Sequence, residues 1–124
     1  MKKKYTKGSL DHIPIKDNVV EGNETFRTLI SGQEAKVIQI DTHGSMDSPG
    51  EWYDQDEDEW VLLIRGSAMV EFFDGEIVTL NEGEYLYIPA GLRHRVFSTS
   101  REPHCRWLAV HGKLNKEIDG ENRF

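Results

Sequence analysis

The chain has 124 residues, a length that suits one domain and is hardly enough for two. Its net charge of -7 argues against a nucleic-acid partner, because binding to phosphates requires a basic surface, and no apolar run approaches the length of a membrane span. Cys105 is the only cysteine, so no disulfide can form within the chain, and the basic start "MKKK" lacks the apolar segment of a signal peptide. We therefore expect a cytoplasmic protein.

The elements expected along the chain are all strands. Residues 1–8 are predicted to be a flexible basic tail, and residues 9–124 a single domain. No apolar period of 3.6 residues with caps predicts a helix. Short runs separated by glycine and Asx turns predict an all-β sandwich or barrel. In chain order these runs are ETFRTLI, AKVIQID, EWVLLIR, GSAMVEFF, EIVTL, EYLYIP, HRVFSTS and CRWLAVH.

Two of these runs carry further information. Asp74-Gly75 stands between two strand-like runs and is typical of a hairpin turn, in which both central residues need a positive φ. The run WVLLI, residues 60–64, is apolar at every position, whereas a strand with one face in water should alternate. Something should therefore cover both of its faces. An N-terminal strand or a second subunit could do so, which favours a homodimer.

The turns around residues 59–94 follow a recognisable spacing. In "GEYLYIPAGLRH", five residues separate Gly83 from Pro89, and Gly91 and His94 follow. This stretch resembles the second motif of the cupin superfamily, and "EWVLLIRG", from Glu59 onward, resembles the end of the first cupin motif. The resemblance implies a double-stranded β-helix, or jelly-roll barrel, with Glu59 and His94 meeting inside it.

The first motif departs from the family pattern in one important respect. Cupins usually carry two histidines before the glutamate, but here those positions are Tyr53 and Gln55, or in the longer spacing Trp52 and Asp54. Strand alternation favours Tyr53 and Gln55 as inward residues, because they share a face with Glu59. A bulge in "DQDED" would instead turn Asp54 inward.

The family resemblance also implies a site for a divalent metal. Its ligands would be Glu59 and His94 with Gln55 or Asp54, and Trp52 and Tyr53 would line the pocket. Carboxylate, imidazole and amide ligands could hold Zn, Mn, Ni or Fe weakly. The same residues could instead hold no metal, with Glu59 and His94 paired to each other.

Three functions are compatible with these residues. The first is a small-molecule enzyme or binding protein with a weakly held metal, and the second is a metal-free ligand-binding sensor or accessory protein. The third is an interaction module whose cavity is filled by side chains. The neighbouring Asp56, Glu57 and Asp58 are expected to form a solvated acidic rim that favours cationic ligands. His111 ends the last apolar run and has no motif support.

Overall fold

The computed structural model describes residues 5–11, 18–21, 24–42 and 50–114, with only the backbone of residues 18–21. Within these ranges the chain forms nine strands and no helix, which confirms the all-β prediction. Each of the eight predicted runs overlaps one strand, and β1 is the strand that was not among them. The strands are β1 (Asn18–Glu21), β2 (Glu24–Ser31), β3 (Ala35–Thr42), β4 (Asp58–Arg65), β5 (Ala68–Phe72), β6 (Ile77–Leu80), β7 (Tyr85–Ile88), β8 (His94–Thr99) and β9 (Arg106–Gly112).

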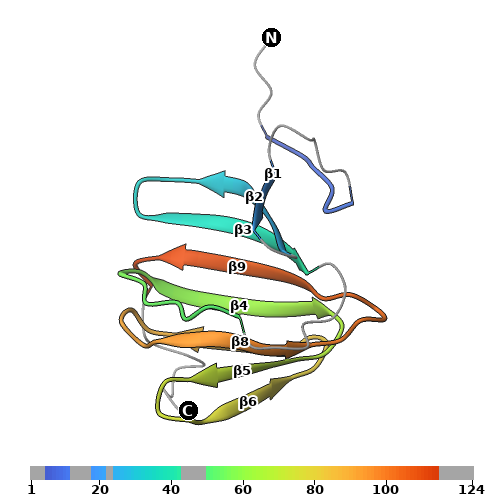
Figure 1. The fold of residues 1–124 in the computed structure, drawn as a ribbon. Helices are drawn as coiled ribbons and strands as arrows, with labels where there is room; N and C mark the ends of the chain where they lie inside the picture. Colours follow the sequence, from blue (N-terminus) through green and yellow to red (C-terminus); the bar gives the residue numbers. More distant parts are fainter. Residues whose placement is uncertain (1–4, 12–17, 22–23, 43–49, 115–124) are drawn as a thin grey trace.

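The strands form two antiparallel sheets. One has the order β1-β2-β3-β9-β4-β7 and the other has the order β6-β5-β8. Figure 1 shows β9 and β4 in the middle of the molecule, with β2 and β3 on one side and the smaller sheet on the other. This crossing order, in which β9 returns between β3 and β4, makes a β-barrel of the jelly-roll type.

The described part of the chain contains no helix with the length and apolar character needed to cross a membrane.

The core lies between the inner faces of the two sheets. On β4 the inward positions Glu59, Val61 and Leu63 are buried, and the alternate positions are half-buried. Full burial of each aliphatic side chain stabilises the fold by about 1.5–3 kcal/mol. The buried apolar cluster consists of Val61, Leu63, Ala68, Val70, Phe72, Leu80, Ile88, Cys105, Trp107 and Ala109.

Two glycine turns have a positive φ, and one of them leads toward the cavity. The predicted hairpin is present, because β5 and β6 pair across Asp74-Gly75, where Gly75 has a φ of 100°. Gly91 has a φ of 82°, a conformation that favours glycine, and its amide donates to the Gln55 carbonyl at 2.8 Å. The turn at Gly91 therefore leads directly into His94, the first residue of β8, beside the segment that carries Gln55.

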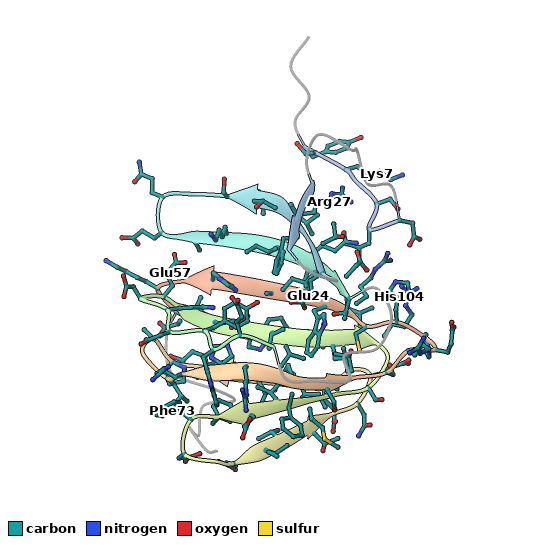
Figure 2. All side chains as sticks on the ribbon, viewed as in Figure 1. Lys7, Glu24, Arg27, Glu57, Phe73 and His104 are labelled. Carbon is teal, nitrogen blue, oxygen red and sulfur yellow. The ribbon has the colours of Figure 1, made fainter. Side chains whose placement is uncertain are left out.

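The N-terminal segment 5–11 lies against the larger sheet. Arg27 of β2 donates to the Ser9 carbonyl at 3.1 Å, and the Gln39 amide of β3 donates to the Leu10 carbonyl at 2.9 Å. Figure 2 shows Lys7 and Arg27 at this end of the molecule, away from the smaller sheet.

Candidate functional site

A cavity of about 80 Å³ lies between the two sheets. A single buried water needs about 10–15 Å³ on this scale, so the cavity has room for several waters or a small organic group. Most of its lining is aliphatic or aromatic. The polar side chains that line it are Glu24, Tyr53, Gln55, Glu59, His94 and His111.

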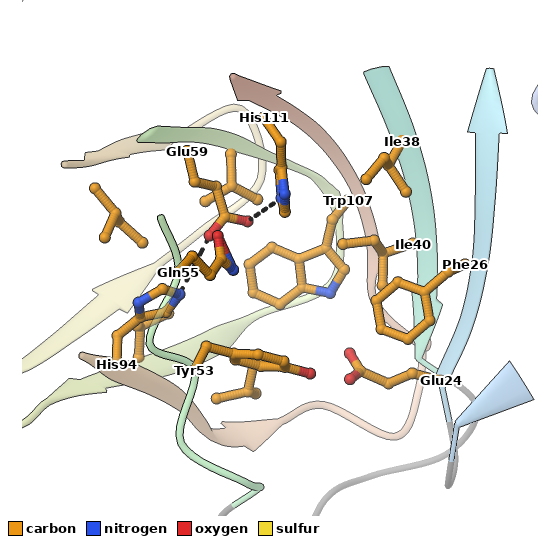
Figure 3. A pocket seen from close by; sticks show the side chains of 14 residues that line it. Glu24, Phe26, Ile38, Ile40, Tyr53, Gln55, Glu59, His94, Trp107 and His111 are labelled. Carbon is orange, nitrogen blue, oxygen red and sulfur yellow. Dashed lines mark hydrogen bonds and ion pairs between the residues drawn. The ribbon is translucent and has the colours of Figure 1, made fainter. Parts of the chain in front are cut away.

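Glu59 is the centre of one end of this cavity (Figure 3). Its carboxylate is buried, with 7% of the residue exposed. Oε1 lies 3.2 Å from Nε2 of His94, and Oε2 lies 3.1 Å from Nε2 of His111. His111 reaches Glu59 because the two residues are directly opposite each other in the pairing of β4 with β9. Each oxygen of one carboxylate thus faces its own imidazole.

The two imidazoles decide the protonation of Glu59. Burial alone would raise the pKa of this carboxyl, because desolvation disfavours the charged form. Hydrogen bonds with His111 and His94 outweigh burial and lower the pKa from 4.5 to about 2. Glu59 is therefore ionised at neutral pH although it is buried.

His94 is held in a defined orientation by both of its nitrogens. Its Nδ1 lies 3.0 Å from the Leu92 carbonyl, which can only accept, so Nδ1 carries a proton. Burial would lower the pKa of His94, but the hydrogen bonds with Glu59 and Leu92 outweigh it and raise the pKa above 6.5. With both nitrogens facing acceptors, the imidazolium form of His94 is favoured.

Gln55 extends this polar end of the cavity. Backbone hydrogen bonds between Tyr53 and His94, at 2.7 and 3.1 Å, place the segment before β4 beside the start of β8. The Gln55 side chain then points toward Glu59 and His94 (Figure 3). Its Oε1 is buried and has no hydrogen-bond partner among the residues that the structure describes. An unsatisfied buried oxygen is uncommon in folded proteins, and at a cavity wall it indicates a place for a ligand, an ion or water.

A second carboxylate, Glu24, lines the same cavity. This first residue of β2 is 9% exposed, and Thr42 Oγ1 donates to its Oε2 at 3.3 Å. Trp107 Nε1 in turn donates to Thr42 Oγ1 at 3.3 Å. Figure 3 shows Glu24 apart from the Glu59 cluster, with the Tyr53 hydroxyl pointing toward it.

Comparison with known proteins identifies the fold family. The family model described as "Cupin domain" matches residues 37–111, more than half of the chain. This chain belongs to the cupin family.

Solved structures agree with this membership. The cupin is 32% identical to a proposed mannose-6-phosphate isomerase of Ralstonia eutropha JMP134, over 89% of this chain and 100% of that one, with a TM-score of 0.72. It resembles a variant of Bacillus subtilis oxalate decarboxylase at 22% identity, over 86% of this chain and 31% of that one, with a TM-score of 0.64. KdgF from Halomonas sp. is similar at 13% identity, over 78% of this chain and 86% of that one, with a TM-score of 0.65. These last two likenesses concern the fold alone. No curated protein matches the sequence.

The structure brings together four of the six residues predicted for the site. Glu59, His94, Gln55 and Tyr53 all line the cavity. Asp54 is exposed and lies outside the cavity lining. Trp52 is also outside the lining, where it packs edge-on against Phe73 at 5.1 Å between ring centroids.

The acidic stretch before β4 has two different roles. Asp56 and Glu57 are exposed, and Figure 2 shows Glu57 at the outer edge of the barrel. Asp58 is not part of a solvated rim, because it is half-buried and accepts hydrogen bonds from the amides of Ala90 at 2.9 Å and Leu114 at 3.0 Å. Asp58 therefore anchors the ends of the strands beside Glu59.

Two polar cavity residues, His111 and Glu24, were not among the residues predicted for the site. His111 had one relevant signal, namely its position at the end of the last apolar run. Glu24 had none, because it stands at the start of a strand that lies far from both cupin motifs in the sequence. Both enter the cavity through the pairing of distant strands.

The family implies a metal, and the side chains at Glu59 test that expectation. Two imidazoles, a carboxylate and the unpartnered Gln55 oxygen are ligands that suit a first-row divalent ion. In this arrangement, however, both carboxylate oxygens already face imidazole nitrogens. The described residues contain no group of three or more His, Cys, Asp or Glu side chains placed to hold a metal. The side chains suit a metal in their chemistry, but these hydrogen bonds would have to open to admit one.

Proposed function

We propose that this cupin binds a small organic molecule in the cavity, with a polar group of that molecule at Glu59, His94 and His111. The observation that carries the proposal is the buried carboxylate with an imidazole nitrogen 3.2 Å from one oxygen and 3.1 Å from the other. Burying such charged groups costs more desolvation than burying apolar side chains of similar volume. A polar cluster at the end of a mostly apolar cavity is typical of a ligand site.

The same cluster supports acid–base chemistry on the bound molecule. Because its pKa is raised and both of its nitrogens face acceptors, the protonated form of His94 is favoured, and this form can donate a proton to a ligand oxygen or nitrogen. Glu59 stays ionised and keeps the imidazole oriented. In this proposal His94 is the proton donor and Glu59 stabilises its charged form.

The charges of the cavity restrict the ligand. The name of the Ralstonia relative points to a phosphorylated sugar. The residues that line the cavity in the described part of this chain include no lysine and no arginine, and the imidazolium of His94 is already paired with Glu59. Phosphate recognition in a dry site requires such cations. We therefore propose a ligand without a phosphate group.

A second candidate function is binding of a divalent metal at the same side chains. The buried, unpartnered Oε1 of Gln55 favours it, since an amide oxygen can complete a set of two imidazoles and a carboxylate. The hydrogen bonds of Glu59 would then be replaced by bonds to the ion. Zn, Mn, Ni and Fe are all compatible with that ligand set.

One experiment separates the two candidates. Protein purified without a His-tag and stripped with EDTA is screened against a library of small fragments by ligand-observed NMR, and hits are titrated into Glu59→Gln and the surface control Glu34→Gln. We expect binding without metal and a loss of about tenfold or more in Glu59→Gln, since hydrogen bonds to charged groups contribute roughly 1.5–3 kcal/mol. Glu34→Gln should bind like the wild type.

Other results would decide against the proposal. Fragments that bind only after Zn²⁺ or Mn²⁺ is added would favour the metal site. If fragments bind equally well to the wild type and to a correctly folded Glu59→Gln variant, the Glu59 carboxylate does not contribute to ligand binding. Circular dichroism of each variant serves as the folding control.

A further inference from the structure

We infer that the outer face of the smaller sheet is an interface for a second copy of this chain, with Arg93 of each copy against Asp54 of the other. The inference concerns the outside of the barrel and does not depend on ligand binding in the cavity. Three features support it: a group of exposed apolar side chains, a cation and a carboxylate without ion pairs among the described residues, and a local balance of charge.

Large apolar side chains are exposed together on this face. Phe73 is 58% exposed, Ile77 44% and Met69 38%, and Leu92 in the turn before β8 is 41% exposed. Ile77 lies opposite Glu71 in the pairing of β5 with β6, and Met69 and Phe73 are two positions away from Glu71 on either side. Figure 2 shows Phe73 projecting outward from the smaller sheet. A contiguous group of this kind marks an interaction surface, whereas single exposed apolar residues do not.

Strand register places charged and aromatic side chains beside this group. An isolated antiparallel bridge pairs Tyr53 with His94, and both of these side chains line the cavity. Because side chains alternate along extended segments, the residues before and after each of them point outward. These outward residues are Trp52, Asp54, Arg93 and Arg95. The same register sets Asp54 opposite Arg93.

Arg93 and Asp54 carry charges that a second copy could pair. The guanidinium of Arg93 stacks on the Phe73 ring, 4.0 Å from its centroid, and its buried Nε has no hydrogen-bond partner among the described residues. Neither Arg93 nor the exposed Asp54 forms an ion pair with a side chain in the part of the chain that the structure describes. By contrast, Arg95 is paired with Glu71 at 2.7 Å. The charges of Arg93 and Asp54 thus remain available to another molecule.

This arrangement fits a second copy of the chain better than a different partner. A two-fold axis sets the same patch of two copies face to face, so the patch must be complementary to itself. A cation and a carboxylate side by side meet this condition, because the axis can set Arg93 against Asp54 and Asp54 against Arg93. On this face Arg93 and Arg95 also balance Asp54 and Glu71, whereas the whole chain carries -7, so two copies can approach here with little repulsion. Arginine and aromatic side chains are enriched at the centres of protein interfaces.

The test measures self-association by sedimentation velocity at several protein concentrations. We expect the wild type to form a dimer with twice the 14.3 kDa mass of one chain. Arg93→Glu and Asp54→Arg should each weaken the dimer by about a hundredfold or more, because each reversal sets like charges together at two symmetric contacts. An equimolar mixture of the two variants should form a heterodimer, because opposite charges then meet at both contacts.

Two further variants make the test specific. Phe73→Ser removes the exposed ring on which Arg93 stacks, so we expect it to weaken the dimer by about tenfold or more. It also provides an answer if a charge-reversed variant does not fold, since a ring that is 58% exposed contributes little to the core. Glu34→Lys reverses an exposed carboxylate between β2 and β3 and should leave the dissociation constant of the dimer unchanged.

Three results would overturn the inference. One is a wild type that sediments as a monomer at every concentration up to its solubility limit. Another is an unchanged dimer in a folded Arg93→Glu, Asp54→Arg or Phe73→Ser variant, because the two copies would then meet on a different surface. The last is a mixture of the two charge-reversed variants that stays monomeric, because Arg93 and Asp54 would then not face each other across the two-fold axis.

Discussion

Glu59 and Asp41 are both buried carboxylates of the larger sheet, but they lie on opposite faces of it and have different partners. Glu59 faces the cavity and contacts the imidazoles of His94 and His111. Asp41 follows the cavity-lining Ile40 on β3 and therefore points to the outer face. There its Oδ1 accepts from Arg106 Nε at 2.8 Å.

The network around Asp41 attaches the N-terminal segment to the sheet. Gln39 Nε2 donates to Asp41 Oδ2 and to the Leu10 carbonyl, each at 2.9 Å. Arg106 also contacts Asp11, with 2.7 Å between its nitrogen and the carboxylate oxygen. A guanidinium stays charged at every pH at which the protein folds, so this network holds one fixed arrangement.

The comparison shows how two buried charges can serve different ends. Asp41 has a permanent counter-charge, and the network that includes Gln39 and Arg106 joins three segments of the chain. Glu59 instead faces the imidazoles of His94 and His111, and it lies beside an open cavity. The first arrangement stabilises the fold, whereas the second suits proton transfer and ligand binding.

Removing Asp41 should have the largest effect on stability. Asp41→Asn leaves the buried guanidinium of Arg106 with only the exposed carboxylate of Asp11 as counter-charge, and breaking a buried pair costs about 3 kcal/mol or more. We expect the free energy of unfolding in urea to fall by this amount at both pH 5 and pH 8. A loss below about 0.5 kcal/mol, typical of exposed ion pairs, would show that the network does not stabilise the sheet.

Glu59 should make stability depend on acid pH. Its pKa is about 2 in the folded protein and 4.5 ordinarily, so the folded state gains stability above pH 4.5 and loses it as pH falls toward 2. The shift corresponds to about 3 kcal/mol. Urea unfolding at several pH values should show this loss in the wild type. Glu59→Gln has no carboxyl to titrate at this position, so its free energy of unfolding should fall less between pH 4.5 and 2, by that amount. An equal fall in the wild type and the variant would contradict the prediction.

His94 should show the opposite sign of pH dependence. Its folded-state pKa lies above 6.5, so its stabilising contribution is complete below that pH and disappears as pH rises through the raised pKa. In Glu59→Gln the hydrogen bond to a charged partner is lost while burial remains, so the pKa of His94 should fall. NMR titration of the ring protons measures both values. If the pKa of His94 in Glu59→Gln equals or exceeds the wild-type value, Glu59 is not the cause of the raised pKa of His94.

The smallest effect is expected at Glu34. Its carboxylate lies 3.8 Å from Lys113 Nζ, and both side chains are largely exposed. Glu34→Gln should change the free energy of unfolding by about 0.5 kcal/mol or less, because exposed ion pairs contribute little. A loss of stability comparable to that of Asp41→Asn would show that burial does not explain why one ion pair stabilises the fold more than the other.

The sequence predicted the strands better than the cavity. Strands β2 to β9 could be recognised because each is a β-branched or apolar run bounded by turn residues, as at Asp74-Gly75. β1 is a run of four residues, NVVE, which is too short to stand out. Glu59 and His94 followed from the resemblance of the glycine and proline spacing around them to the cupin motifs. Gln55 and Tyr53 stand at the positions of the family's histidines in the register that strand alternation favours.

The remaining cavity residues depend on register between distant strands. Glu59 is opposite His111, 52 residues later, because β9 pairs with β4, and no local pattern encodes that pairing. Glu24 likewise enters the cavity through the pairing of β2 with β3. Such contacts are set by how both sheets bury their apolar faces together, which a single sequence does not reveal.

The central claim is that Glu59 is ionised inside the barrel because two imidazoles face it. The most direct test follows the Glu59 side-chain carboxyl carbon by NMR as pH is lowered, with Glu59→Gln used to assign the signal. The account predicts a midpoint near the pKa of about 2. A midpoint at or above the ordinary 4.5 would contradict it, because burial would then outweigh the hydrogen bonds from His94 and His111.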